Sequence, residues 1–273
     1  MRCFYCARTG KPASDEHIPS QFLGSRLKTR RVCPECNERA GVEIDNRFAD
    51  YLMVQMPKAL ADVRSIKRQR KEPSIETDGI VSVTGEPVRV RFTPEGRQAH
   101  RSNGEIVRDV VEVKYGLDSD LWVRFIAKVA LGCAARLFTD EWLDEPVARA
   151  LRELLWCGPI DNVIWPRGVP GWPGELQEEH PARQALGDDR HLIGLATDDD
   201  DPTAAVAIAL LFGGQIACRL PLPGVAVSGS GPVWILDWQS PEPPQKQDYD
   251  SAIERMLRDR GWSTSQIDDM RLP

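Results

Sequence analysis

The sequence lacks any apolar run long enough to cross a bilayer, since no stretch of about 18 uncharged apolar residues occurs in it. Its first residues also lack the apolar segment of a secretory signal and lead directly into a cysteine motif. The hydrophobic fraction of 41% and the charged fraction of 28% are ordinary for a soluble globular protein. These features argue against a membrane protein, and we expect this protein in the cytoplasm.

A disulfide framework is not indicated either, because the seven cysteines are odd in number and unevenly placed. Three of them are scattered among apolar neighbours: Cys133, Cys157 and Cys218. We interpret these three as small buried hydrophobic side chains. The other four form two CxxC pairs near the N-terminus, Cys3 with Cys6 and Cys33 with Cys36.

The two CxxC pairs predict a structural zinc site. They lie on either side of residues 7–32 and supply the four thiolate ligands that a closed tetrahedral site requires. Such a metal contributes folding free energy that a module of about 60 residues otherwise struggles to collect. Four cysteine ligands leave no coordination position open, so any chemistry must lie elsewhere.

A Glu-His pair lies between the two cysteine pairs. The segment from Ser14 to Gly24 reads SDEHIPSQFLG, and Asn37 follows the second CxxC directly. This order of motifs over residues 1–50, CxxC, Glu-His-Ile-Pro, Leu-Gly and CxxCN, resembles HNH endonucleases whose finger is braced by four cysteines. The resemblance implies a ββα-metal fold, which is a treble-clef-like zinc module.

The resemblance assigns three residues to a centre that cleaves phosphodiester bonds. It implies that Glu16 and Asn37 bind a divalent cation, Mg or Mn, and that His17 is the general base. A neutral imidazole can take a proton from water near neutral pH, and a divalent cation can stabilise the scissile phosphate and the departing 3′ oxyanion. Adjacent residues of an extended segment point to opposite sides, so Glu16 can hold metal while His17 faces the attacking water.

One position departs from the family pattern, and a second register follows from it. The family carries an Asn about nine positions before the last ligand, where it fixes the loop that orients the histidine. Here Lys28 occupies that position, and Thr29 beside it could supply a hydrogen bond instead. In the second register Asn37 takes the middle position and Asn46 binds the metal, with Asp45 in support. We prefer the first register because Asn37 follows the CxxC directly.

The net charge of −6 conceals an asymmetry along the chain. Residues 1–71 hold 15 Lys and Arg against 8 Asp and Glu, a balance of +7, which leaves 20 against 33, or −13, for the rest. A polyanion, by the resemblance double-stranded DNA, would therefore dock on the first quarter of the chain. A second basic cluster within it, residues 64–71, either binds the same polyanion or is a solvated helix end. The candidates for phosphate contact lie between the Glu-His pair and the second CxxC: Arg26, Lys28, Arg30 and Arg31.

Hydrophobic patterns predict the remaining elements. Apolar residues at helical spacing predict one or two helices over residues 42–63. Runs of β-branched residues separated by turn sequences predict three short strands over residues 75–115, and two amphipathic helices follow over residues 119–156. The Gly- and Pro-rich residues 157–190 predict a long loop. The last expected elements are four strands and a final helix, at residues 192–196, 204–212, 215–220, 233–237 and 248–259.

Length and pattern together predict an α+β protein of two parts. Residues 1–70 form an HNH nuclease domain with a structural zinc. Residues 75–273 form an α+β accessory domain of short antiparallel strands and a helix pair. This second part is acidic and shows no catalytic set of residues, so we expect it to serve regulation, dimerisation or partner sensing.

We therefore expect a metal-dependent HNH endonuclease that cleaves DNA, of the kind used in bacterial antiphage defence or restriction. Two alternatives stay open. The first is a non-catalytic zinc module that binds nucleic acid or protein, in which Glu16 and His17 merely brace the finger. The second is an RNase or toxin with the same centre. Concerted cleavage of both strands by single-metal centres would need two active sites, and therefore a homodimer; the accessory domain could also bind a regulatory protein.

Overall fold

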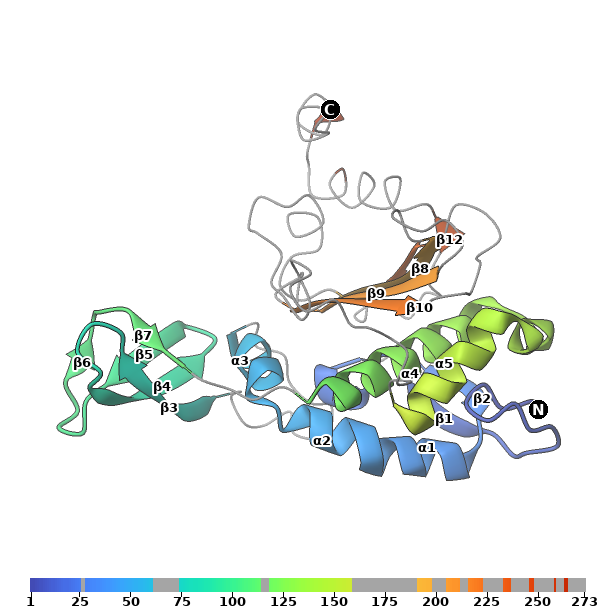
Figure 1. Cartoon of the computed structure of the whole chain (residues 1–273), viewed down its shortest axis with the longest axis horizontal. Helices are drawn as coiled ribbons and strands as arrows, with labels where there is room; N and C mark the ends of the chain where they lie inside the picture. The colour runs from blue at the N-terminus through green and yellow to red at the C-terminus, as the bar shows by residue number, and fades with distance from the viewer. Residues whose placement is uncertain are drawn as a thin grey trace.

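The computed structural model shows an α+β protein with antiparallel sheets, as predicted from the sequence. No helix among the described residues is long and apolar enough to span a membrane. In Figure 1 one sheet lies over the helical body, and the other lies apart from it at the left. The structure describes residues 1–25, 28–60, 74–113, 118–158, 191–197, 205–211, 216–222, 233–236, 246–247, 258 and 263–264.

The N-terminal module is a hairpin followed by a helix. Strand β1 (Ser14–His17) pairs antiparallel with β2 (Lys28–Val32), and the short helix η1 (Gln21–Leu23) lies in their connection. Helix α1 (Pro34–Ala40) starts inside the second CxxC, because Pro34 suits the first helical turn and Glu35 complements the positive helix end. The ββα order expected from the resemblance is confirmed.

The helical path continues beyond α1 without a loop. A π-type turn, η2 (Gly41–Asp45), leads into α2 (Asn46–Ala49), and α3 (Leu52–Leu60) follows. Helix was predicted only from residue 42, so the observed start is earlier. The reason is that the cysteine ligands themselves take part in the first turn of α1.

The predicted helix pair is confirmed as α4 (Ser119–Leu137) and α5 (Pro146–Cys157), joined by η4 (Asp140–Asp144). Cys133 is buried as expected, but Cys157 is exposed because it lies at the end of α5. The carboxylate of Asp118 caps α4 by accepting a hydrogen bond from the Leu121 amide at 3.1 Å. Helix α4 contacts α5, the N-terminal module and the second sheet, so it is buried on most sides. Figure 1 shows α4 between the N-terminal helices and that sheet.

The first sheet has five strands in the order β6-β5-β4-β3-β7. Three strands were predicted here, and the third of them forms two short strands, β6 and β7. The sequence GRQAH of β5 was missed because it contains no β-branched or large aromatic residue. The pairing of β5 with β4 and β6 decides its conformation instead. The strands are β3 (Ile75–Val81), β4 (Pro87–Thr93), β5 (Gly96–His100), β6 (Ile106–Val107) and β7 (Val111–Glu112).

The second sheet has the order β10-β9-β8-β11-β12, and its first four strands in chain order match the four predicted apolar runs. The predicted loop at 157–190 and the predicted helix at 248–259 lie almost entirely outside the described residues. The strands are β8 (His191–Thr197), β9 (Ala205–Leu211), β10 (Ile216–Leu222), β11 (Val233–Leu236) and β12 (Lys246–Gln247).

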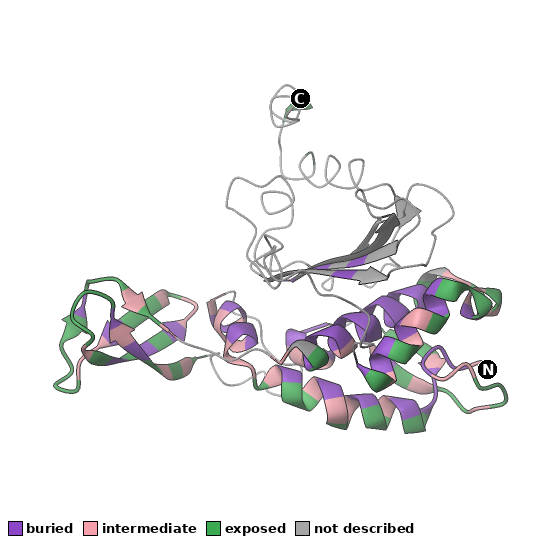
Figure 2. Ribbon diagram, in the orientation of Figure 1, coloured by how far each residue is buried: buried purple, intermediate pink, exposed green. Residues whose placement is uncertain are grey.

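The buried side chains form two clusters that do not follow the boundary predicted near residue 70 (Figure 2). One cluster joins the N-terminal module to α4, α5, β9 and β10. At its centre Phe48 of α2 stacks on Phe125 of α4 with ring centroids 3.8 Å apart. The sheet β3–β7 has a smaller core of its own, closed by Ala59 of α3. Helix α4 therefore completes the core of the N-terminal module.

Candidate functional site

The four N-terminal cysteines converge on one point. Cys3 and Cys6 lie in a tight knuckle in which the Ala7 amide donates to the Cys3 carbonyl at 2.7 Å. Cys33 occupies the N-cap position of α1, and Cys36 lies in its first turn. The four sulfur atoms all lie within 4.8 Å of one another. Tetrahedral zinc with Zn–S bonds of about 2.3 Å places its sulfurs about 3.8 Å apart, so this cluster is compatible with a structural zinc.

The surroundings of the cluster favour the thiolate at Cys3, whereas the pKa values of Cys6 and Cys36 are raised. A hydrogen bond from Cys36 lowers the pKa of Cys3, although burial opposes this shift, and the same bond raises the pKa of Cys36. The amide of Cys33 also points at the Cys3 sulfur, at 3.4 Å. Backbone amides directed at a sulfur stabilise its negative charge, which a zinc ligand carries.

The hairpin presents Glu16 and His17 on opposite sides, as the strand pattern predicted. Glu16 is 3% exposed, whereas His17 is half-buried. His17 Nδ1 lies 2.9 Å from the Ser25 carbonyl oxygen. Because a carbonyl only accepts hydrogen bonds, this contact places the proton on Nδ1 and leaves Nε2 as the acceptor.

The pKa of His17 is lowered from its ordinary value. Partial burial is the main cause, and the positive charges of Lys28 and Lys128 act in the same direction, against the Ser25 hydrogen bond and Glu16. A neutral imidazole with a free Nε2 is the form that a general base requires at cellular pH.

The loop that orients His17 is held by Ser25, a residue that the sequence did not indicate. The Ser25 hydroxyl donates to the Ile18 carbonyl at 2.5 Å, and the side chain is fully buried. Gly24, with φ at +86°, provides the left-handed turn that leads into it. Thr29, which was considered for this orienting role, accepts instead from the Arg31 amide at 3.3 Å.

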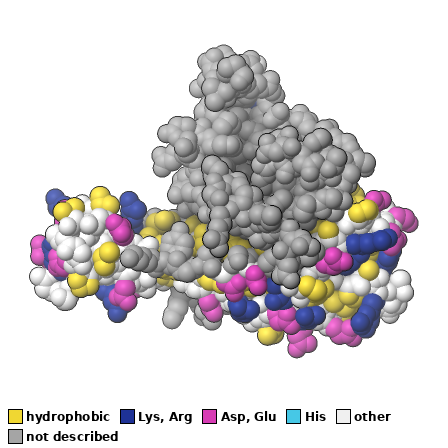
Figure 3. All heavy atoms as spheres, viewed as in Figure 1, with side chains coloured by type: hydrophobic (Ala, Val, Ile, Leu, Met, Phe, Trp, Pro, Cys, Tyr) yellow, Lys and Arg dark blue, Asp and Glu magenta, His cyan; other side chains and the backbone are white. Residues whose placement is uncertain are grey.

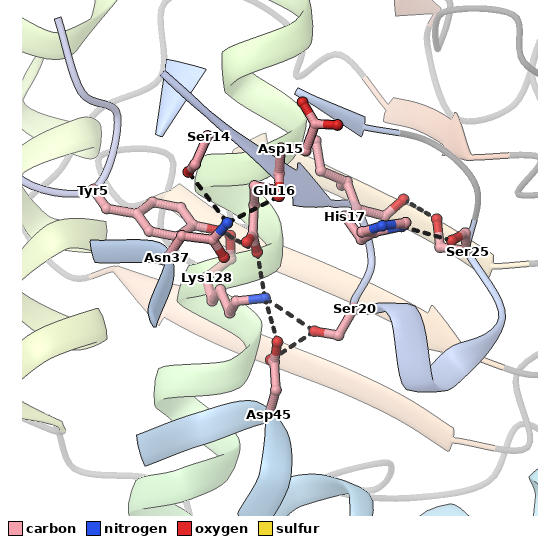
Figure 4. Close-up of polar contacts among 11 residues, drawn as sticks. Tyr5, Ser14, Asp15, Glu16, His17, Ser20, Ser25, Asn37, Asp45 and Lys128 are labelled. Carbon is pink, nitrogen blue, oxygen red and sulfur yellow. Dashed lines mark hydrogen bonds and ion pairs between the residues drawn. The ribbon is translucent and has the colours of Figure 1, made fainter. Parts of the chain in front are cut away.

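The carboxylate of Glu16 faces the interior, where it meets a lysine from α4 (Figure 4). Lys128 Nζ lies 2.5 Å from Glu16 Oε1 and 3.0 Å from Asp45 Oδ2. The Tyr5 hydroxyl donates to the same Glu16 oxygen at 3.1 Å. Lys128 also donates to the Ser20 hydroxyl at 3.0 Å, and Ser20 donates to Asp45 at 2.6 Å. We call Tyr5, Glu16, Ser20, Asp45 and Lys128 the Lys128 cluster.

Lys128 stays charged despite being only 1% exposed. Burial acts to lower its pKa, but the carboxylates of Asp45 and Glu16 outweigh burial and raise the pKa above its usual value. A lone lysine within the apolar stretch FIAKVALGCAA was the available signal, because a fully buried lysine requires partners.

Asn37 ties α1 to the first strand. Its side-chain nitrogen donates to the Asp15 carbonyl at 2.9 Å and to the Ser14 hydroxyl at 3.2 Å. These contacts fix Asn37 against β1, and its role as a metal ligand stays a prediction. Asn46, the metal ligand of the second register, is exposed at the start of α2.

Residues 3–53 match the family described as HNH endonuclease. The matched segment contains both CxxC pairs, the Glu-His pair and Asp45, and we call it the HNH domain. The resemblance seen in the sequence is thereby confirmed for about a fifth of the chain. Searches of curated proteins and of solved structures returned no match. An HNH domain with a four-cysteine site suggests a nuclease, and the family implies nucleic acid as the substrate class.

The arrangement of the HNH domain does not offer Glu16 to a divalent cation. Its carboxylate is buried and is already paired with the ammonium group of Lys128. The amide nitrogen of Asn37 donates to β1, whereas a cation would bind the amide oxygen. A divalent cation bound to Glu16 would lie close to the positive charge of Lys128.

The predicted phosphate-binding residues separate into two groups. Lys28 and Arg30 lie on the exposed side of β2, near Asp15 at 3.3 Å and 3.5 Å. Arg31 points the other way: it contacts the Phe138 carbonyl and the Asp140 carboxylate. Arg31 thus joins the HNH domain to α4 and η4, and the expectation that it grips phosphate is not supported. Arg26 and the basic cluster at 64–71 lie outside the described residues.

On the face drawn in Figure 3, acidic and basic side chains intermingle over the helical body. The positive balance of the first 71 residues does not form a uniform basic surface on this face. The exposed edge of β2, with Lys28 and Arg30, is therefore the candidate for phosphate contact that the described residues offer.

Proposed function

We propose that this protein is an endonuclease that hydrolyses phosphodiester bonds of double-stranded DNA, with His17 as the general base. The observation that carries the proposal is the state of His17. Its pKa is lowered by partial burial, and it is half-exposed and held through Nδ1 by Ser25, in an HNH domain with a four-cysteine site.

The residues of this chain have two roles in the base-catalysed step: one takes the proton, and the others hold the phosphate backbone. Nε2 of His17 takes a proton from the attacking water, and the Nδ1 hydrogen bond to Ser25 keeps the ring oriented while it becomes positively charged. Lys28 and Arg30 stand on the exposed side of the same hairpin, where they can hold the phosphodiester backbone.

Dependence on Mg or Mn belongs to the proposal because the HNH resemblance implies it. When bound, such a cation would supply charge stabilisation for the scissile phosphate and the departing 3′ oxyanion. In the arrangement described, Glu16 is paired with Lys128, so a cation at Glu16 requires Lys128 to withdraw.

Supercoiled plasmid provides the first test, with Mg²⁺, Mn²⁺ and EDTA in parallel. We expect nicking that His17→Ala reduces by about a hundredfold or more. His100→Ala is the matched control, because His100 lies on β5 in the separate sheet. Unchanged nicking by the His17 variant would show that His17 is not the base. Single-stranded DNA and RNA in the same assay decide the nucleic acid class.

The buried pairing of Glu16 favours a second candidate, a zinc module that binds nucleic acid without cutting it. In that case Glu16 and His17 brace the hairpin, and the protein binds DNA but leaves plasmid intact under every metal condition. An RNase or toxin would instead show cleavage of RNA alone.

We also propose, from the resemblance, a role in bacterial antiphage defence or restriction in the cytoplasm. Dimerisation or a regulatory partner, through the part after residue 75, would bring two centres to the two strands. Plaque counts with wild type and His17→Ala test the first proposal. The mass in solution, with and without DNA, tests the second.

A further inference from the structure

In the Lys128 cluster, oxygen atoms surround a positive charge as they would in a metal-cation site. Here the positive charge is the ammonium group of a lysine side chain. Lys128 Nζ has three hydrogens to donate, and three oxygens surround it. They belong to Glu16, Ser20 and Asp45, at 2.5, 3.0 and 3.0 Å. Tyr5 and Ser20 donate to the two carboxylates in turn, so the polar groups of the cluster satisfy one another.

We propose that the Lys128 ammonium is the resident cation of the Glu16–Asp45 carboxylate pair and keeps divalent cations off Glu16. The cluster lies where the HNH resemblance expects a metal, but its positive charge comes from α4, far along the sequence. A divalent cation reaches Glu16 only when Lys128 is withdrawn.

Packing holds Lys128 in this place. Its helix is anchored by Trp122 and Phe125, both fully buried, and Phe125 stacks on Phe48 of α2. One turn beyond Lys128, Gly132 lies against Ile18, the residue after His17. Residues four apart share one face of a helix, so Lys128 and Gly132 dock on the hairpin together. Withdrawal of the ammonium therefore requires a change in the Lys128 side-chain conformation or a movement of α4 relative to the hairpin.

Charge, like packing, disfavours a divalent cation at Glu16. The lysine neutralises one of the two carboxylates, so the cluster keeps only one net negative charge to attract a cation. A divalent cation beside Glu16 would face the ammonium at the distance of a direct contact, where repulsion inside a protein is strong. Removing the Lys128 charge while keeping its volume should convert the carboxylate pair into an open cation site.

Binding of Mn²⁺ to the zinc-loaded protein, measured by electron paramagnetic resonance without nucleic acid, tests this directly. Wild type should show no Mn²⁺ site that depends on Glu16. Lys128→Met should bind Mn²⁺ about a hundredfold more tightly or better, and Glu16→Gln in that background should abolish the gain. Lys11→Met removes one positive charge from the same module and should bind like wild type, because Lys11 pairs with Glu35 on the surface.

Two results overturn the inference. The first is a wild-type Mn²⁺ site that Glu16→Gln removes, a comparison that needs no change at Lys128. The second is a folded Lys128→Met protein, with wild-type zinc content, that gains no Mn²⁺ site; Lys128→Gln serves if the methionine variant does not fold. The inference rests on the proposed function only in placing Glu16 at the cleavage centre. Mn²⁺ binding is measured without substrate, so its result does not depend on nicking. Unchanged nicking by His17→Ala would contradict the proposed function, and a Lys128→Met protein that gains no Mn²⁺ site would contradict the inference.

Discussion

Gly132 of α4 lies directly against Ile18, the residue that follows His17 in the hairpin. A Cβ atom at position 132 would lie 3.0 Å from Ile18 Cγ1, so the helix approaches the hairpin as closely as a glycine allows. Ile18 is 1% exposed and belongs to the large buried cluster. The contact explains how a helix from the second half of the chain can set the geometry beside His17.

We expect Gly132→Val to destabilise the protein by about 1–3 kcal/mol, because the added side chain overpacks the α4–hairpin contact. Gly41→Val is the matched control. Gly41 also has helical backbone angles, but a Cβ there meets no atom within 4 Å. The free energy of unfolding in urea measures both. Equal effects at the two positions would mean that α4 does not pack on the hairpin as described.

The pKa of His17 predicts the pH dependence of cleavage. A general base acts only when unprotonated, so the rate rises with pH through the pKa of His17 and levels off above it. Partial burial, then the charge of Lys28, hold this pKa below the ordinary 6.5, so the midpoint of the rise in rate should lie below pH 6.5.

Lys28→Met removes one of the charges that lower this pKa, so it should move the titration of His17 to higher pH. Lys11→Met, which removes a charge paired with Glu35, should leave the titration in place. Nuclear magnetic resonance of the histidine ring protons follows the titration directly, with His17→Ala for assignment. A His17 that titrates above 6.5 in the wild type would contradict the burial argument.

Local sequence patterns predicted the zinc ligands and most of the elements, because their causes are local. The CxxC spacing brings two sulfurs to one turn, and alternation on β1 separates Glu16 from His17. The partners of these residues could not be predicted in the same way. His17 is oriented by a backbone carbonyl, at Ser25, which every residue type possesses.

Contacts between residues far apart in the sequence could not be predicted from sequence patterns either. Lys128 meets Glu16 through the packing of α4 on the hairpin, a tertiary contact that no local spacing encodes. Arg30 and Arg31 carry the same charge, yet alternation along β2 sends them to different sides. Strand alternation predicts that Arg30 and Arg31 lie on different sides. The prediction of Arg31 as a phosphate contact depended on its charge alone.

Substitutions of Arg30 and Arg31 should therefore have opposite profiles. Arg31→Met should lower the free energy of unfolding by about 1–3 kcal/mol, because it loses its hydrogen bonds to Phe138 and Asp140. Arg30→Met should leave stability unchanged and weaken DNA binding, with a salt dependence reduced by about one ion. Urea unfolding and binding isotherms at several salt concentrations separate the two. A shared profile would mean that both arginines face the same surroundings.

Removal of zinc should unfold the HNH domain and loosen α4 with it. Structural zinc contributes on the order of 10 kcal/mol to small domains, and here the cysteine knuckle shares one buried cluster with α4 and α5. Cys36→Ser should lose the metal and the cooperative thermal transition. Cys133→Ala should keep one zinc per chain, because Cys133 is buried within α4 outside the four-cysteine site. Metal analysis measures the zinc content of each variant, and calorimetry measures its thermal transition. If Cys36→Ser lost its zinc and still melted like the wild type, the helix pair would fold without the HNH domain, and the shared core would not be the source of its stability.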